Sequence, residues 1–341
     1  MLLLCGDIGG TKTILRLVEV NSDSQSFKTV QEKQFVSAEF VDLVPMVKSF
    51  MTEFSLEQPS SACFAIAGPV VNNQSHLTNL NWQLTTERLE QELEIPKVSL
   101  LNDFAANSYG VLGLKESELA VLQPGKAIPE QTIAVIGAGT GLGESFLICQ
   151  KGQYNVFPSE GGHADFAPRN DLELELWRYL YQKLGQKHIS VERVVSGQGI
   201  IGIYQFLRDT EFAPENKVIA PKIRAWETSA ESGIDPGQVI ALGSQEEKDP
   251  LCVKAIAMFV EAYGAAAGNL ALKVLPFGGI YIAGGIAAKN LEAIKQGNFL
   301  KAFADKGRMD HLLKDIPIYV VLNPQVGLLG SILYALKTEV S

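Results

Sequence analysis

The sequence predicts a mixed α/β protein with two domains, and three observations lead to this fold class. The chain has 341 residues, which is about twice the usual length of one domain. Apolar strand patterns alternate with helical patterns along the chain, which predicts sheets covered by helices. A pattern of strand, glycine turn and strand occurs at the N-terminus and again near residue 132, which indicates a duplicated architecture.

Composition and charge narrow the range of partners. With 46% apolar and 20% charged residues the chain has enough apolar material for a core. The 29 Lys and Arg against 38 Asp and Glu give a net charge of −9. This balance argues against nucleic acid or an anionic membrane as the main partner, because both attract basic surfaces. A small anionic ligand needs only local hydrogen-bond donors, so the net charge does not exclude such a ligand.

The cysteines and the apolar segments predict a cytoplasmic protein. Four cysteines lie far apart without a CxxC pair, so we expect reduced, buried thiols. The apolar run at residues 1–5 is too short for a signal peptide. The most membrane-like window, 255–272, is interrupted by Glu261, Asn269 and two glycines, so we expect a buried helix there.

Two hairpins are predicted first. The segment LLLCGDI, the turn Gly9–Thr11 and the segment ILRLVEV form the first, since β-branched residues favour strands on both sides of the turn. IAVIG, the turn 138–143 and SFLI form the second.

Further elements follow in chain order. Helices are expected at 87–94, 104–112, 172–184 and 250–272, and strands at 61–67, 98–101, 280–283 and 318–321. Residues 116–131 contain two prolines and predict a loop or hinge between the halves. In residues 208–237 both helix and strand patterns fade, and the role of this polar segment stays open.

Three glycine-rich segments are candidate phosphate loops, because a backbone without Cβ can direct several N–H groups at one anion. They are Gly6–Thr11, Gly137–Gly143, and the pairs Gly278–Gly279 and Gly284–Gly285. The first is not a Walker A loop. That motif requires glycine directly before its lysine, and here Thr11 precedes Lys12. The second lacks the last glycine of the dinucleotide pattern. Each pair taken alone is also compatible with a plain hairpin turn.

Asp7 gives the first glycine segment a chemical preference. A carboxylate beside a phosphate loop repels the phosphates unless Mg²⁺ lies between them. The sequence therefore predicts a magnesium-bound nucleotide at this turn.

Asn102 and Asp103 stand between a predicted strand and a predicted helix. This pair is suited to binding and deprotonating an alcohol. A helix N-cap explains the same residues without any function, and both interpretations stay open.

The segment Pro158–Pro168 contains Glu160, His163 and Asp165 within six positions. The spacing of a helical zinc motif is absent, so a loop that binds a polyol is favoured over a metal site. Glu192 is either a ligand contact or an acid in the first turn of a helix.

Taken together, these motifs resemble the bacterial glucokinases of the actin, hexokinase and heat-shock-chaperone ATPase fold. The matching stretches run in family order: Gly6–Thr11, Leu77–Trp82, Leu101–Phe104, Gly137–Gly143, Glu160–Pro168, Glu192–Gly197, Phe277–Gly285 and Gly327–Ser331. They span almost the whole chain, so together they are more specific than any single loop. No cluster of His and Cys is present, and the resemblance is therefore to the zinc-free branch.

The resemblance implies two actin-like, or ribonuclease H-like, α/β domains with mixed sheets flanked by helices and an active site in the cleft between them. We expect a small domain of residues 1–112 plus 316–341 and a large domain of residues 113–315. The implied reaction is ATP-dependent phosphorylation of glucose at its 6-hydroxyl, the first step of glycolysis. Relatives are often dimers, so a homodimer is expected.

The resemblance also implies roles for single residues. Asp103 would be the base, and Asp7 would bind Mg²⁺ with ATP, directly or through water. The implied glucose ligands are Asn102, Asp103, Glu160, His163 and Glu192. The implied ATP contacts are Gly6, Asp7, Ile8, Gly9, Gly10, Thr11, Gly139, Thr140, Gly141, Gly284 and Gly285.

Other functions remain open at this point. A kinase for mannose, fructose or an amino sugar would use the same hydroxyl-binding residues. A non-catalytic sensor of sugar or nucleotide on the same fold is a second alternative, although the presence of both Asp7 and Asp103 favours an enzyme.

Overall fold

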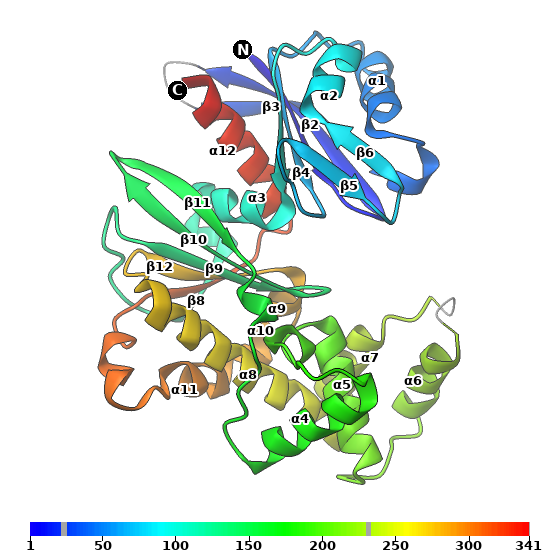
Figure 1. Cartoon of the computed structure of the whole chain (residues 1–341), viewed down its shortest axis with the longest axis vertical. Helices are drawn as coiled ribbons and strands as arrows, with labels where there is room; N and C mark the ends of the chain where they lie inside the picture. The colour runs from blue at the N-terminus through cyan, green and yellow to red at the C-terminus, as the bar shows by residue number, and fades with distance from the viewer. Residues whose placement is uncertain (22–25, 230–232, 341) are drawn as a thin grey trace. The chain divides into compact units, whose positions relative to one another are not determined.

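The structure is a computed structural model that describes residues 1–21, 26–229 and 233–340. The chain divides into two compact units (Figure 1), of which unit 1 is Met1–Glu118 with Asn323–Ser341 and unit 2 is Leu119–Leu322. The expected boundaries, at residues 112 and 316, lie slightly earlier in the chain. Strand β13 (Ile318–Val321) pairs with β8 (Leu119–Gln123), and this pairing keeps both segments in unit 2.

Unit 1 is built on a five-stranded sheet in the order β3-β2-β1-β4-β7. The strands are β1 (Leu2–Ile8), β2 (Lys12–Asn21), β3 (Ser26–Val36), β4 (Ser61–Ile66) and β7 (Val98–Asn102). The first three are antiparallel, and β4 and β7 continue parallel to β1. The predicted first hairpin is therefore confirmed. A separate hairpin of β5 (Gln74–Leu77) and β6 (Trp82–Thr85) lies outside this sheet.

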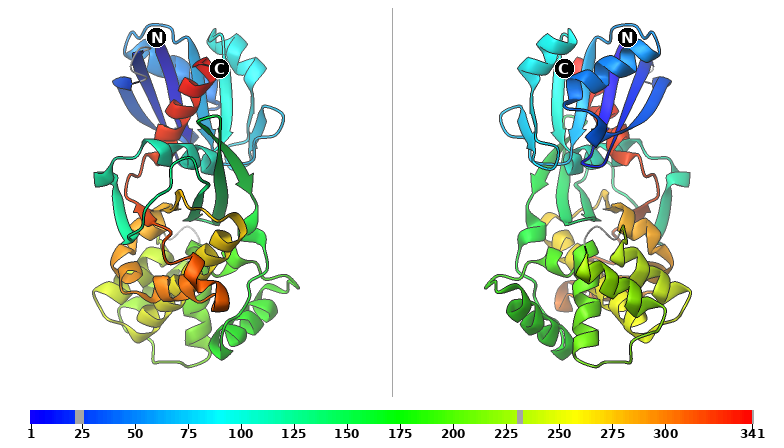
Figure 2. Two further views of the ribbon diagram at one scale, coloured as in Figure 1. Left: turned by 90° about the vertical axis from the view of Figure 1, so that its left-hand side faces the viewer. Right: turned by 90° about the vertical axis from the view of Figure 1, so that its right-hand side faces the viewer.

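Both faces of this sheet are covered because its central strands are apolar at successive positions. Leu4 packs with α1 (Leu43–Glu53) and α2 (Thr86–Leu93) in one core cluster. Leu3 and Cys5 pack on the other face with α12 (Val326–Val340). Helix α3 (Asp103–Gly110) packs against α12, and Figure 2 shows α12 beside the sheet in both views.

Unit 2 repeats this plan in its six-stranded sheet of order β11-β10-β9-β12-β13-β8. Strands β9 (Ile133–Ala138), β10 (Leu142–Gln150) and β11 (Gln153–Ser159) are antiparallel, which confirms the second hairpin. Strand β12 (Gly279–Ala283) and β13 then run parallel to β9. Since the order and direction of five strands match those of unit 1, the predicted duplication is confirmed.

Unit 2 also contains most of the helices. They are α4 (Asp171–Leu184), α5 (Gly197–Asp209), α6 (Ile219–Thr228), α7 (Pro236–Gln245), α8 (Pro250–Val274), α9 (Gly285–Lys289), α10 (Leu291–Lys295) and α11 (Asn298–Ala304). Helix α8 is long and apolar enough to cross a membrane by length and composition, but most of its apolar window is buried in the unit. The prediction of a buried helix is confirmed.

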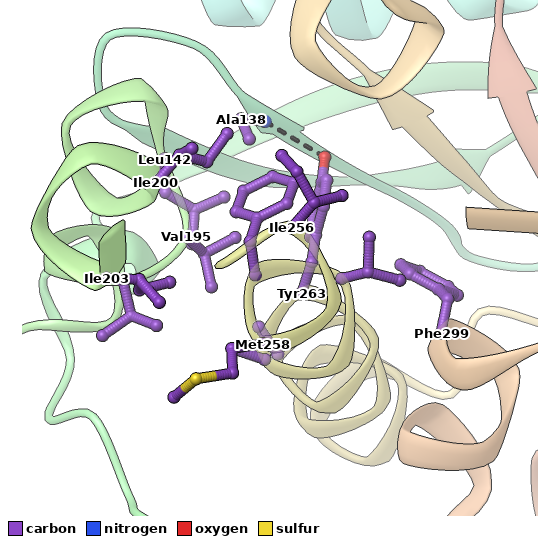
Figure 3. Packing of buried hydrophobic residues seen from close by; sticks show 14 of the residues in the cluster. Ala138, Leu142, Val195, Ile200, Ile203, Ile256, Met258, Tyr263 and Phe299 are labelled. Atoms are coloured by element: carbon purple, nitrogen blue, oxygen red, sulfur yellow. Dashed lines mark hydrogen bonds between the residues drawn. The ribbon is translucent and has the colours of Figure 1, made fainter. Parts of the chain in front are cut away.

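Helix α8 is fixed to the sheet by a polar contact inside an apolar core. Tyr263 Oη accepts a hydrogen bond of 3.0 Å from Ala138 N at the end of β9. Figure 3 shows the Tyr263 ring extending from α8 to this strand between Ile256 and Phe299. Because Ala138 precedes the second glycine turn, this contact fixes the strand end from which the turn begins.

Two predictions of irregular structure are wrong in part. Strand β8 lies within residues 116–131, where a loop or hinge was expected, although the chain does pass from unit 1 to unit 2 there. Helix α6 and the start of α7 lie within residues 208–237, where no element was predicted. Residues 230–232 of that segment lie outside the described residues. Proline and polar residues interrupt the apolar pattern of both helices: Pro221 is exposed on α6, and Pro236 is buried at the first position of α7.

The cysteines are free, and Cys5, Cys63 and Cys252 are buried as expected. Cys149 is only partly buried.

Candidate active site

The first glycine turn connects β1 to β2 and is held by its own backbone. Gly9 N donates to Lys12 O at 3.0 Å, and the hydroxyl of Ser37 donates to Gly9 O at 2.8 Å. A Cβ on Gly9 would lie 2.9 Å from Lys12 O, so the turn requires glycine at this position. These contacts hold the backbone groups of the turn in fixed positions at the end of a buried strand.

Asp7 lies on β1 beside this turn, and its carboxyl group is close to that of Asp103. Burial is the main reason that the pKa of Asp7 is raised to about 6, and the charge of Asp103 raises it further, whereas Lys12 opposes the rise. Burial also raises the pKa of Asp103, while hydrogen bonds to its carboxylate oppose that rise. The structure thus brings these two predicted residues together in unit 1.

Asn102 is the N-cap of α3. Its Oδ1 accepts hydrogen bonds from Phe104 N at 2.9 Å and Ala105 N at 3.2 Å, and its Nδ2 donates to Gly68 O at 3.0 Å. The capping alternative for Asn102 is therefore confirmed as a structural role. The side-chain amide of Asn102 also forms a hydrogen bond to the Asp103 carboxylate.

The second glycine turn, Gly139–Gly141, connects β9 to β10 in unit 2. Gly139 N donates to Gly141 O at 2.8 Å, and Gly139 O accepts from Gly197 N at 2.9 Å. The second bond ties the turn to the N-terminus of α5, where backbone N–H groups favour negative charge. A Cβ on Gly141 would lie 2.8 Å from the Glu192 carboxylate, so the sugar-loop candidate and the phosphate-turn candidate are neighbours.

Glu160, His163 and Glu192 also come together in unit 2. His163 Nδ1 lies 3.5 Å from Glu192 Oε1, and His163 Nε2 lies 3.8 Å from Glu160 Oε2. Their side chains are 91% exposed for Glu160, 60% for His163 and 20% for Glu192. Two carboxylates on either side of one accessible imidazole can bind the hydroxyls of a polyol.

Backbone pairing explains how Glu192 reaches His163 from a distant part of the sequence. Val191 N donates to Ala164 O at 2.9 Å, and Phe166 N donates to Ile189 O at 2.8 Å. Glu192 then lies in a 3₁₀-helix of three residues, Val191–Arg193. So short a helix has little dipole, which weakens the alternative that Glu192 is merely a first-turn acid.

Asp165, by contrast, points to a different partner. Its Oδ1 lies 3.0 Å from His188 Nε2, and both side chains are mostly exposed. Within the described residues, no group of three or more His, Cys, Asp or Glu side chains could hold a metal ion.

A cavity of about 590 Å³ opens beside the second glycine turn, and all of its walls belong to unit 2. Its lining residues come from the turn, α5, α6, α7 and the α9–α10 region: Gly139, Thr140, Gly197, Gln198, Ile200, Ile201, Trp226, Asp235, Pro236, Gly237, Gln238, Ala241, Leu242, Gln245, Ile286, Lys289 and Asn290. Figure 3 shows Ile200 of α5 on the side of Ala138 and Leu142, the residues that flank the turn.

Of the predicted nucleotide residues in unit 2, Gly139 and Thr140 line this cavity. Gly284 instead packs against β9, since a Cβ there would lie 2.6 Å from Ala138 O, and its φ is 87°. Gly285 begins α9 and precedes the lining residue Ile286. The sequence analysis missed the walls formed by α6 and α7, although Asp235-Pro236 is a typical helix start that could have located one of them.

The sequence profile of the glucokinase family matches residues 4–338. The chain therefore belongs to the glucokinase family. A glucokinase from Nostoc punctiforme is 56% identical over 339 residues, covering 98% of this chain and 99% of that protein. One from a Nostoc species is 57% identical over 340 residues, with 98% and 99% coverage. The crystal structure of a glucokinase from an Antarctic psychrotroph has a TM-score of 0.84 at 28% identity, covering 100% of this chain and 99% of that one.

Family membership confirms the resemblance inferred from the motifs and the two-unit actin-like fold. All candidate residues in both units lie within the stretch that the glucokinase profile matches.

Proposed function

We propose that the protein transfers the γ-phosphoryl group of ATP to the 6-hydroxyl of glucose, which yields glucose 6-phosphate and ADP. Membership of the glucokinase family over nearly the whole chain supports this reaction. The observation that carries the mechanism is the partly buried carboxyl group of Asp103, whose charge acts on Asp7 beside the first glycine turn.

Asp103 is the proposed base. In the reaction a bond forms between the sugar 6-oxygen and the γ-phosphorus, the bond from that phosphorus to the β–γ bridging oxygen breaks, and the hydroxyl proton passes to Asp103. Burial raises the pKa of Asp103 above that of a free aspartate, which makes its carboxylate a better proton acceptor. The hydrogen bond from Phe104 N to Asp103 Oδ1, 2.7 Å long, fixes the orientation of the carboxylate in the first turn of α3.

Asp7 is the proposed contact to Mg²⁺, directly or through water. Partial burial and the charge of Asp103 both raise the pKa of Asp7, so a negative charge at this position is unfavourable without a nearby cation. Carboxylate oxygens and water are the ligands that Mg²⁺ prefers, so this residue fits the ion. The ion would supply neutralisation of the phosphate charge.

The two glycine turns are the proposed phosphate contacts, with Gly6–Thr11 in unit 1 and Gly139–Gly141 in unit 2. Glucose is proposed to contact Asn102 and Asp103 of unit 1 and Glu160, His163 and Glu192 of unit 2. The close approach of Glu192 to Gly141 supports a common site for sugar and phosphate.

The test is ADP formation on addition of glucose, followed with a coupled assay. Asp103→Asn is expected to lower kcat by at least about 100-fold while glucose still binds, because general-base catalysis contributes about 10²- to 10⁴-fold. The matched control is Asp171→Asn at an exposed position of α4, which should retain normal turnover. Near-normal turnover of Asp103→Asn would remove this residue from the mechanism.

A panel of hexoses in the same assay addresses the alternatives. Faster turnover of mannose, fructose or an amino sugar than of glucose would reassign the substrate. Absence of ADP release with every sugar would favour the non-catalytic sensor.

We also propose that the enzyme acts in the cytoplasm, which the free and mostly buried cysteine thiols support. The homodimer stays a prediction that light scattering after size-exclusion chromatography would test.

A further inference from the structure

Helix α6 lies in the segment to which the sequence assigned no role, yet it supplies one wall of the 590 Å³ cavity through Trp226. The indole is half-buried. Trp226 follows the buried Ile223 by three positions and the buried Ile219 by seven, so it lies on the inner face of the helix. An aromatic side chain that is packed on one side and borders a cavity on the other presents a flat apolar surface to a ligand.

The helix that carries Trp226 is held in place by contacts of residues before and after it, Ile219 and Glu227. Ile219 packs against α7, where a Cβ on Gly243 would lie 3.0 Å from Ile219 Cδ1. The next residue, Glu227, accepts hydrogen bonds from Arg208 Nη1 at 2.9 and 3.1 Å and from Gln205 Nε2 at 2.6 Å, both on α5. These bonds connect the C-terminal turn of α6 to α5, and the N-terminus of α5 contacts the second glycine turn.

The cavity lining combines backbone donors with apolar and amide side chains. Gly139 N and Gly197 N are bonded to Gly141 O and Gly139 O, so the next lining residues, Thr140 and Gln198, are the candidates to direct backbone N–H groups at an anion. The lining also includes Trp226 and Leu242, the side-chain amides of Gln238 and Gln245, and the charged residues Asp235 and Lys289. Anion-binding N–H groups in one cavity with a flat apolar side chain and amides fit a nucleotide, with its phosphates at the turn and its base against the apolar side chain.

We propose that Trp226 contacts the base of the ATP substrate through its indole face and is a determinant of nucleotide affinity. This inference rests on the proposed function, which requires ATP but does not say which residues recognise its base. Contact between a base and an aromatic ring contributes about 1–3 kcal/mol per base, or roughly 5- to 150-fold in affinity.

The test uses tryptophan fluorescence and calorimetry, with ADP as the probe. The chain has three tryptophans, of which Trp82 is buried in unit 1 and Trp177 stacks on Tyr181 of α4. We expect ADP to change the fluorescence of the unaltered protein and of Trp177→Phe, and not that of Trp226→Phe. Trp226→Ala should bind ADP on the order of 10- to 100-fold more weakly, but should bind inorganic tripolyphosphate as the unaltered protein does, since that probe has no base.

The outcomes separate this inference from the proposed function. If the unaltered protein binds no ADP, the proposed function fails. If it binds ADP and Trp226→Ala binds ADP equally well, the role of Trp226 alone is overturned. An equal loss of ADP and tripolyphosphate affinity would also overturn it, because it would show a general disturbance of the pocket. Should Trp226→Ala fail to fold, the fluorescence of Trp226→Phe decides the question.

Discussion

At the scale of single residues, Asp7 is proposed to bind Mg²⁺, but its negative charge destabilises the folded protein when no cation is bound. Its pKa is about 6 in the folded chain against 3.8 for an ordinary aspartate, with burial as the first cause and the charge of Asp103 as the second. The folded protein therefore holds the Asp7 proton more tightly than the unfolded chain does. Protonated Asp7 therefore contributes to the stability of the folded protein. This contribution is fully present below pH 3.8 and is lost as the pH rises through about 6.

This linkage predicts how Asp7→Asn changes stability in metal-free buffer. The variant should be more stable than the unaltered protein above pH 6, by at most about 3 kcal/mol, because asparagine avoids a buried charge. The advantage should shrink as the pH falls from 6 towards 4. Urea unfolding across this range measures it, and an advantage that is independent of pH would contradict the assignment of the shift to Asp7.

Single residues also show which candidates a sequence pattern can select. Asp7, Asp103, Glu160, His163 and Glu192 could be selected because charged side chains beside glycine or in loops are conspicuous. The capping role of Asn102 was one of two open alternatives, since a cap and a ligand contact require the same residue type at a strand end. Trp226 could not be selected, because a tryptophan in a polar segment has no distinguishing pattern until its helix is placed.

At the scale of elements, the position of Asp103 depends on how closely α3 packs against α12. A Cβ on Gly330 of α12 would lie 1.7 Å from Ala106 O, and one on Gly110 of α3 would lie 2.0 Å from Val326 O. Glycine on both helices thus allows their backbones to approach closely. Since Asp103 is the first residue of α3, this packing also determines where the proposed base lies.

Gly330→Ala is accordingly expected to destabilise the protein by about 1–3 kcal/mol or more, because the new methyl group forces the two helices apart. Gly202→Ala on α5 is the matched control, since its Cβ would lie at an ordinary 3.4 Å from Leu180 Cδ2. Alanine favours a helix more than glycine does, so the control should be neutral or slightly stabilising. Denaturant midpoints measure both, and equal midpoints for Gly330→Ala and the unaltered chain would refute close packing here.

Elements were predictable from the sequence where their pattern was local. Strands β4, β7, β12 and β13 have short apolar runs bounded by turn residues, and α8 has a long apolar pattern, so each was located closely. Strand β8 was missed because its assignment depends on a partner far along the chain, and helix α6 was missed because Pro221 and charged residues interrupt its apolar pattern. Strand β8 is a strand only because β13, almost two hundred residues later, pairs with it.

At the scale of the whole molecule, the duplicated sheets place one glycine turn in each unit, and the sequence predicted this from the repeated hairpin. The proposed ligand contacts divide unequally. The proposed glucose contacts come from both units, whereas every residue that lines the cavity proposed for the nucleotide belongs to unit 2. Sugar affinity and nucleotide affinity should therefore be separable by substitution.

Glu160→Gln should weaken glucose binding by about 10- to 100-fold, because a hydrogen bond from a hydroxyl to a charged acceptor contributes roughly 1.5–3 kcal/mol. The same variant should bind ADP normally, since Glu160 does not line the nucleotide cavity and its side chain is 91% exposed. Trp226→Ala should show the opposite pattern, with glucose affinity preserved. Calorimetric titration of each ligand alone measures all four constants. If Glu160→Gln weakened ADP as much as glucose, the residue would act on the fold of unit 2 rather than through contact with the sugar.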